Sequence, residues 1–189
     1  AIKQTNLKRI LAYSSIGHVG FMLAALSAKN IISIQGFYFY AIVYAFLSLA
    51  AFSFLMLIGQ ESKYNISNLS GLAKTNPILA FLFSSLMLSF AGIPPMLGFF
   101  SKFYVFKAII TNADNQDFIL PMLMVIYSAI AAFYYLRIVK VIYFDKAQKD
   151  NKITSENKAG IVVFAALSLL SITAIFFVEG MFTILNNFL

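Results

Sequence analysis

Long uninterrupted runs of apolar residues alternate with short polar stretches along the chain. A helix needs about 20 apolar residues, at about 1.5 Å each, to cross the roughly 30 Å of hydrocarbon in a membrane. Runs of that length cover Ile10 to Ala28, Ile34 to Ile58, Phe118 to Phe144 and Ala159 to Leu185. The pattern therefore predicts four membrane-spanning helices. It disfavours a membrane barrel, whose strands would appear as alternating segments of about ten residues.

A fifth apolar stretch, from Pro77 to Ile110, is interrupted near its middle. Proline removes a backbone donor and glycine permits non-helical dihedral angles, so we expect the helix to break there. The residues expected to cause the break are Gly92, Pro94, Pro95 and Gly98. The pattern fits either two short spans joined by a turn or one span with an unwound centre.

The positions of the basic residues favour one broken span. With that topology most bases fall on one side, namely Lys3, Lys8, Arg9, Lys63, Lys74, Lys146, Lys149, Lys152 and Lys158. The other side has Lys29 and the loop from Asn112 to Asp117, which carries two aspartates and no base. Because basic loops collect on one side of a membrane, we predict five spans with a broken third helix. The loops Gln60–Asn76 and Asp145–Lys158 should then share a side.

Composition agrees with an all-α, polytopic transmembrane bundle that forms a single domain over residues 1–189. The chain is 61% apolar and 11% charged, whereas a soluble domain is roughly 45 to 50% apolar and about 25% charged. Its net charge is +7, but in a membrane protein the basic residues mark which loops lie on one side of the membrane. We therefore expect no nucleic-acid partner. The first residues show neither an initiator methionine nor a signal-peptide pattern, so we expect a piece of a longer chain or a processed product.

Lys102 is the strongest candidate for chemistry, because it follows the predicted break among aromatic residues. A lysine at membrane depth costs roughly 2.5 to 3.5 kcal/mol to insert, and such residues are functional by default. Burial penalises its charged form, which suits a proton carrier. The alternative is a lysine that snorkels to the interface or caps the unwound helix end. For Lys107, farther along the same helix, snorkelling is the preferred interpretation.

His18 is the single histidine of the chain and lies near the middle of the first span. Its ordinary pKa near 6.5 suits proton relay, and we expect Ser14, one turn earlier, to hydrogen-bond it. Packing without any relay role remains the alternative. Lys8 begins the same helix and is a third candidate for proton transfer if it points inward. Glu179 lies late in the last span, where a position near the outer interface explains it.

The sequence contains no phosphate loop, nucleotide fingerprint, nucleophile triad or metal-ligand cluster, and it lacks cysteine. Thiolate-held zinc, iron–sulfur clusters and disulfides are thereby excluded. We therefore expect no catalytic residue for covalent chemistry, no cofactor-binding residue and no metal site in this chain.

Two groups of motifs resemble one known family. The segment from Gln4 to Gly20, QTNLKRILAYSSIGHVG, resembles a block shared by the antiporter-like subunits of respiratory complex I. The motifs GLAKTNP at residues 71–77, AGIPP at 91–95 and GFFSKFY at 98–104 are similar to the signature of NADH:ubiquinone oxidoreductase chain 2, called chain N in bacteria. The resemblance covers nearly the whole sequence and implies the carboxy-terminal repeat and last helix of a longer antiporter-like fold.

The resemblance implies a proton-translocating subunit of the complex I membrane arm. It assigns Lys102 as the buried proton carrier and makes His18 and Lys8 candidates for linking the central path to the basic side. Larger antiporter-like chains carry another lysine in the preceding helix, where this sequence has Ser48.

The resemblance also implies partners and a location. NADH, FMN, iron–sulfur clusters and ubiquinone would belong to partner subunits. Other partners would be the lipid bilayer, other membrane-arm subunits and, if the gene is split, a separate amino-terminal half. The expected location is the mitochondrial inner membrane, with the bacterial cytoplasmic membrane as the alternative. Two other functions stay open: a subunit of a multi-chain cation/proton antiporter, and a structural membrane scaffold without a proton path.

Overall fold

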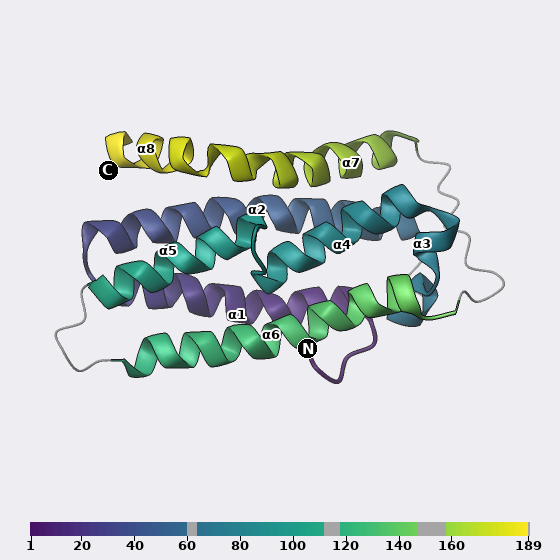
Figure 1. The fold of residues 1–189 in the computed structure, drawn as a ribbon, viewed down its shortest axis with the longest axis horizontal. Helices are drawn as coiled ribbons and strands as arrows, with labels where there is room; N and C mark the ends of the chain where they lie inside the picture. The colour runs from purple at the N-terminus through teal and green to yellow at the C-terminus, as the bar shows by residue number, and fades with distance from the viewer. Residues whose placement is uncertain (60–63, 112–117, 147–157, 189) are drawn as a thin grey trace.

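The computed structural model describes residues 1–59, 64–111, 118–146 and 158–188, and these residues form a bundle of long helices (Figure 1). Helices α1 (Leu7–Ser27), α2 (Ile31–Ile58) and α6 (Ile119–Phe144) match three predicted spans within a few residues. Within the described residues, four stretches are long and apolar enough to span a membrane, and no strand occurs. The all-α membrane architecture is therefore confirmed.

The fifth apolar stretch forms two helices, α4 (Pro77–Ala91) and α5 (Leu97–Thr111), as the glycines and prolines predict. Before them lie two short elements, η2 (Ile66–Leu69) and α3 (Leu72–Thr75). Figure 1 shows that α5 continues away from α4 along the long axis of the bundle, so the two halves together make one broken span. The two-span alternative is excluded by this arrangement.

The last predicted span carries an interruption that the sequence pattern did not predict. It consists of α7 (Lys158–Thr173), the 3-10 turn η3 (Ala174–Phe177) and α8 (Val178–Phe188). These elements follow one another along one side of the bundle (Figure 1), and residues 159–185 still serve as one span by length and composition.

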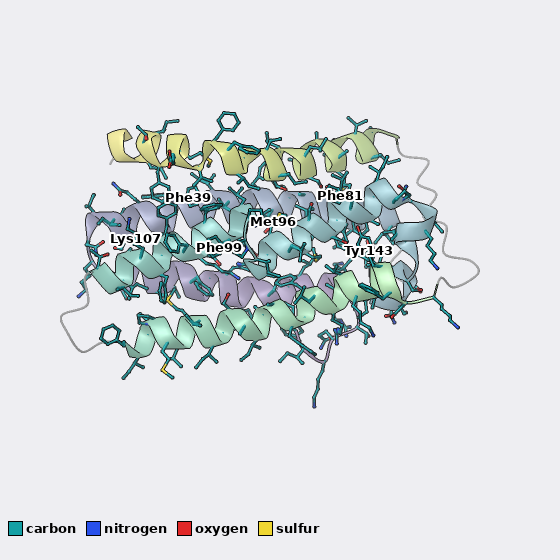
Figure 2. The ribbon with its side chains drawn as sticks, in the orientation of Figure 1. Phe39, Phe81, Met96, Phe99, Lys107 and Tyr143 are labelled. Atoms are coloured by element: carbon teal, nitrogen blue, oxygen red, sulfur yellow. The ribbon has the colours of Figure 1, made fainter. Side chains whose placement is uncertain are left out.

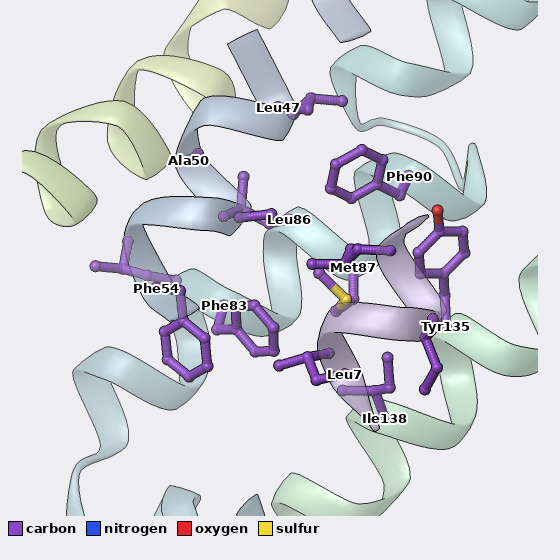
Figure 3. Close-up of a cluster of buried hydrophobic side chains, with 14 of the residues drawn as sticks. Leu7, Leu47, Ala50, Phe54, Phe83, Leu86, Met87, Phe90, Tyr135 and Ile138 are labelled. Atoms are coloured by element: carbon purple, nitrogen blue, oxygen red, sulfur yellow. The ribbon is translucent and has the colours of Figure 1, made fainter. Parts of the chain in front are cut away.

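Helix α2 lies at the centre of the bundle, packed against α1, α4, α5, α7 and α8, and α6 packs on α4 (Figure 1). The core between them is apolar and aromatic, and Figure 3 shows the part around Leu86 and Met87. There the rings of Phe54 and Phe83 stack with centroids 3.7 Å apart. Since helix-on-helix packing needs such a contact surface, these side chains fix the position of α4, and so of the break at its end.

Asparagine side chains cap the helices that frame the break. Asn6 accepts a hydrogen bond from the Arg9 amide at the start of α1, and Asn76 accepts one from the Leu79 amide at the start of α4. Asn30 forms a capping box with Ser33 at the start of α2. These caps satisfy amides that a helix leaves without partners at its first turn, so each helix begins at a defined residue.

The described parts of the two basic loops lie at the same end of the bundle. Figure 1 places α3 beside the end of α6 and the beginning of α7. An antiparallel bridge between Asn6 and Asn65 brings the start of α1 to this end as well. The loop from Asn112 to Asp117, most of the Asp145–Lys158 loop and Lys63 fall outside the described residues.

Candidate proton-transfer site

The break between α4 and α5 is a hydrogen-bonded turn. Gly92 ends α4 with a positive φ of 80°, a backbone conformation that glycine adopts without strain. The amides of Gly92 and Ile93 both donate to the Leu88 carbonyl, at 3.1 Å each. The Met96 amide donates to the Ile93 carbonyl at 3.0 Å. These amides thereby find partners where the chain leaves the helix, which is a requirement at membrane depth.

Lys102 belongs to α5, and its side chain reaches the C-terminal end of α4. Its Nζ donates hydrogen bonds to the carbonyl oxygens of Phe90 at 3.0 Å and Ala91 at 2.8 Å. The last carbonyls of a helix have no partner within the helix and carry the negative end of its dipole, so they suit a cation. A third, longer hydrogen bond of 3.4 Å reaches Ser128 Oγ on α6. With a side chain only 9% exposed, Lys102 is buried, as its sequence position predicts.

Two glycines make room for this arrangement. A Cβ added to Gly92 would lie 2.8 Å from Cδ of Lys102, so the lysine stem passes directly over the glycine. A Cβ added to Gly98 would overlap the backbone oxygen of Ser89. The Gly98 amide instead donates to Ser89 Oγ at 3.0 Å. Glycine at both positions therefore brings the two halves of the broken helix into contact beside Lys102.

A cavity of about 360 Å³ opens next to Lys102, between the break, α5 and α6. Most of its wall is apolar, with Phe99, Phe103 and Met124 among the lining residues, while Lys102 and Ser128 contribute polar groups. The ring of Phe21, 5.6 Å from the Lys102 Nζ, also lines it and provides a cation–π contact. Figure 2 shows Phe99 near the middle of the bundle, at the level of the break.

His18 lies close to the lysine but is held by other groups. Its Nδ1 is 2.8 Å from the Tyr40 hydroxyl, and its Nε2 is 3.2 Å from the Tyr135 hydroxyl. The imidazole stacks on the Tyr44 ring with centroids 4.7 Å apart. It also meets the edge of the Phe90 ring at 5.5 Å. Phe90 thus connects the two sites, since its carbonyl binds Lys102 and its ring contacts His18.

Two expectations about α1 need correction. Ser14 does not bond His18, because both ring nitrogens face tyrosine hydroxyls, while the Ser14 hydroxyl donates to the Leu11 carbonyl of its own helix at 2.8 Å. Lys8 does not point inward, because its side chain is exposed at the first turn of α1. Ten residues separate it from His18, which is about 15 Å along a helix. Of the three residues proposed from the sequence, the structure brings together Lys102 and His18.

The remaining ionisable residues of interest lie at the surface. Lys107 and Glu179 are both exposed, as expected for residues near the interface (Figure 2 labels Lys107). The buried polar partners of the site are side chains whose pairing the sequence did not predict. Ser128 is the single serine of the apolar run from Phe118 to Phe144, which was an available signal. Tyr40 and Tyr135 lie 22 and 117 residues from His18, so no local pattern connects them.

Comparison with known proteins points to one family. Residues 1–131 match the family model described as NADH:quinone oxidoreductase/Mrp antiporter, transmembrane. Relatives named NADH-quinone oxidoreductase subunit N include one from Paramagnetospirillum magneticum, 45% identical over 77% of this chain and 30% of the relative. Another, from Pelagibacter ubique, is 44% identical over 90% of this chain and 36% of the relative. The chain thus spans about a third of the length of these relatives.

The fold is also similar to a solved structure. A chain of respiratory complex I from Thermus thermophilus with bound aureothin superposes with a TM-score of 0.77 at 26% identity, covering 96% of this chain and 40% of that chain. The subunit N relative from the Wolbachia of Brugia malayi aligns over 98% of this chain at 38% identity. The resemblance predicted from the motifs is confirmed, and the chain belongs to the NADH:quinone oxidoreductase/Mrp antiporter transmembrane family.

Proposed function

We propose that this chain is a proton-translocating module in the membrane arm of an NADH:quinone oxidoreductase, with Lys102 as its proton carrier. The observation that carries the proposal is the buried Lys102 ammonium at the C-terminal end of α4, held by the Phe90 and Ala91 carbonyls. All three hydrogen bonds formed by Nζ are available to the protonated amine. The neutral amine keeps two donors for the two carbonyls and gains a lone pair that can accept from the Ser128 hydroxyl, so the lysine stays anchored after it releases its proton.

His18 is proposed as the next proton-transfer group, because a small cavity lined by His18, Ser89 and Ser101 extends from the imidazole to the helix break beside Lys102. Lys8 is proposed only as a surface group at the basic end of α1, where its exposed side chain can exchange protons with water. No residue of this chain is proposed to bind NADH, FMN, iron–sulfur clusters or quinone. In this proposal those groups belong to partner subunits, and the distant redox chemistry drives the proton step.

Two other functions are weighed against this one. A multi-chain cation/proton antiporter shares the matched family, but the relatives reported above are all named subunit N of NADH-quinone oxidoreductase. They are also bacterial, so they give no support to a mitochondrial inner membrane, and we propose the bacterial cytoplasmic membrane. A passive scaffold would have no use for a lysine buried beside a cavity, because inserting that charge costs energy.

The proposal includes other membrane-arm subunits as partners and, if the gene is split, a separate amino-terminal half. Purification of the tagged chain from its own membranes in mild detergent, followed by mass spectrometry, tests this assembly. We expect subunits that carry flavin and iron–sulfur clusters in the same particle, together with NADH oxidation. Co-purification with antiporter subunits alone, without NADH oxidation, would support the antiporter instead.

A further inference from the structure

Both ring nitrogens of His18 face a tyrosine hydroxyl, at 2.8 Å for Tyr40 on α2 and 3.2 Å for Tyr135 on α6. Both tyrosines are almost completely buried. Packing inside the bundle therefore sets the position of each hydroxyl, and contact with lipid headgroups or bulk water does not. Three helices thus meet at one imidazole. We propose that Tyr40 and Tyr135 are the proton-transfer partners on the two sides of His18, so that the imidazole passes protons from one side of its ring to the other.

The His18 ring has two neutral tautomers and one cationic form. Neutral imidazole has one donor and one acceptor nitrogen, whereas imidazolium has two donors. A phenol hydroxyl donates or accepts, depending on its rotation. His18 therefore keeps both hydrogen bonds in either neutral tautomer and in the cation. Backbone carbonyls in place of the two hydroxyls would accept only, and would leave the unprotonated nitrogen of the neutral ring without a donor.

The proton balance of one passage is complete. A proton reaches the unprotonated nitrogen through one tyrosine, whose oxygen takes a replacement proton from its other side, and the ring becomes a cation. The second nitrogen then gives its proton to the other tyrosine, whose own hydroxyl proton leaves in turn. Two N–H bonds are exchanged, one formed and one broken, and no electrons are transferred. Both tyrosines end with a hydroxyl, and His18 ends neutral as its other tautomer, which must return to the first before the next passage in the same direction.

Each tyrosine has a polar continuation. On the Tyr40 side, a cavity of about 10 Å³ is lined by His18, Tyr40, Ser89 and Ser101, and so reaches the helix break. That volume is close to what one water molecule requires. On the other side, Tyr134 interacts with both Tyr135 and Tyr127.

Tyr134 and Tyr127 lead from the buried ring to the surface of the bundle. Both line a groove of about 510 Å³ between α1 and α6. The Tyr127 ring lies over Gly17, because a Cβ at Gly17 would overlap it. The hydroxyls thus run from the break beside Lys102, across the His18 ring, to the α1–α6 groove.

The test uses the assembled complex, because the inference rests on the proposed function. Tyr40→Phe and Tyr135→Phe remove one oxygen and keep each ring, so the fold should survive. In membrane vesicles at matched complex content, we expect each to slow NADH-driven proton pumping about fivefold, the effect expected for one lost hydrogen bond on the path. Adding either change to His18→Gln should cause no further loss. Tyr38→Phe is the matched control, because Tyr38 lies on α2 with Tyr40 but is exposed.

A deuterium solvent isotope effect separates proton transfer from packing. If the tyrosine hydroxyls belong to the relay, their Phe variants make proton transfer rate-limiting and the isotope effect on pumping rises. Normal pumping with an unchanged isotope effect in both variants would overturn the inference, as would losses that add to that of His18→Gln. Lys102→Met is measured in the same series. Normal pumping in that variant refutes the proposed function, whatever the tyrosine variants do.

Discussion

At the scale of single residues, the site depends on what surrounds one ammonium group. Lys102 has three oxygen partners, and two of them are carbonyls that α4 leaves unpaired where it ends. A buried charge without partners is very costly, so the helix break and the lysine stabilise each other. Gly92 is part of this fit, because the lysine stem passes over its Cα.

Replacing Gly92 with alanine should destabilise the protein. Its φ of 80° costs a residue with a Cβ about 1 to 2 kcal/mol, and the new methyl group would also press on Cδ of Lys102 at 2.8 Å. We expect a lower midpoint of thermal unfolding in detergent. Gly20→Ala is the control, since a Cβ added at this position in α1 would meet no atom within 4 Å. It should be neutral or stabilise by about 0.5 to 1 kcal/mol. Equal midpoints for both variants would contradict this explanation.

At the scale of the helices, the two halves of the broken span touch through Gly98. The Ser89 oxygen, which belongs to the backbone, lies where a Cβ of residue 98 would be, so a larger residue must move a helix and not a side chain. The contact also sets the distance between α4 and Lys102 on α5. The two halves are therefore in close contact at the break, where the Gly98 amide donates a hydrogen bond to Ser89 Oγ.

Gly98→Ala should therefore be more damaging than an ordinary alanine substitution. Overpacking against backbone typically costs about 1 to 3 kcal/mol, and separation of the halves would also lengthen the Lys102 hydrogen bonds. We expect reduced thermal stability together with reduced NADH-driven proton pumping. Gly180→Ala in α8, where nothing lies within 4 Å of the added Cβ, is the matched control and should lower neither quantity. A normal stability in Gly98→Ala would show that the halves are not in contact.

The elements also show which features the sequence could predict. Helix lengths and the break at residues 92 to 96 follow from local chemistry, so the apolar runs and the Gly/Pro motif located them correctly. The 3-10 turn at Ala174–Phe177 contains no proline or glycine and gave no signal. The partners of His18 were also beyond prediction, because they depend on how α1, α2 and α6 pack. Ser14 was the nearest candidate in sequence, but its hydroxyl interacts with the Leu11 carbonyl and with Tyr135 and not with the imidazole.

At the scale of the whole molecule, charge asymmetry and architecture agree. Lys8 and Arg9 at the start of α1, Lys74 on α3 and Lys146 after α6 lie at one end of the bundle, while Lys29 and Lys107 lie at the other (Figure 1). This is the separation that five spans with a broken third helix require. The site lies between these two ends, which places Lys102 where a charge needs protein partners and not lipid.

The topology can be tested directly because the chain contains no cysteine. Single substitutions at exposed positions, Ser67→Cys, Lys146→Cys and Lys29→Cys, supply one reactive thiol each. With a membrane-impermeant maleimide in sealed vesicles, we expect the first two to react from the same side and Lys29→Cys from the opposite side. Labelling of Ser67→Cys and Lys146→Cys from different sides would refute the five-span arrangement.

The central claim is that Lys102 carries protons, and its most direct test is NADH-driven proton pumping in Lys102→Met and Lys102→Arg at matched complex content. Methionine keeps the length of the side chain without the charge, and arginine keeps a charge that it does not release near neutral pH. A proton carrier predicts that both lose about tenfold or more of the pumping rate, while exposed Lys107→Met keeps it. Near-normal pumping in Lys102→Met, or an arginine variant that pumps normally while methionine prevents assembly, would contradict the claim.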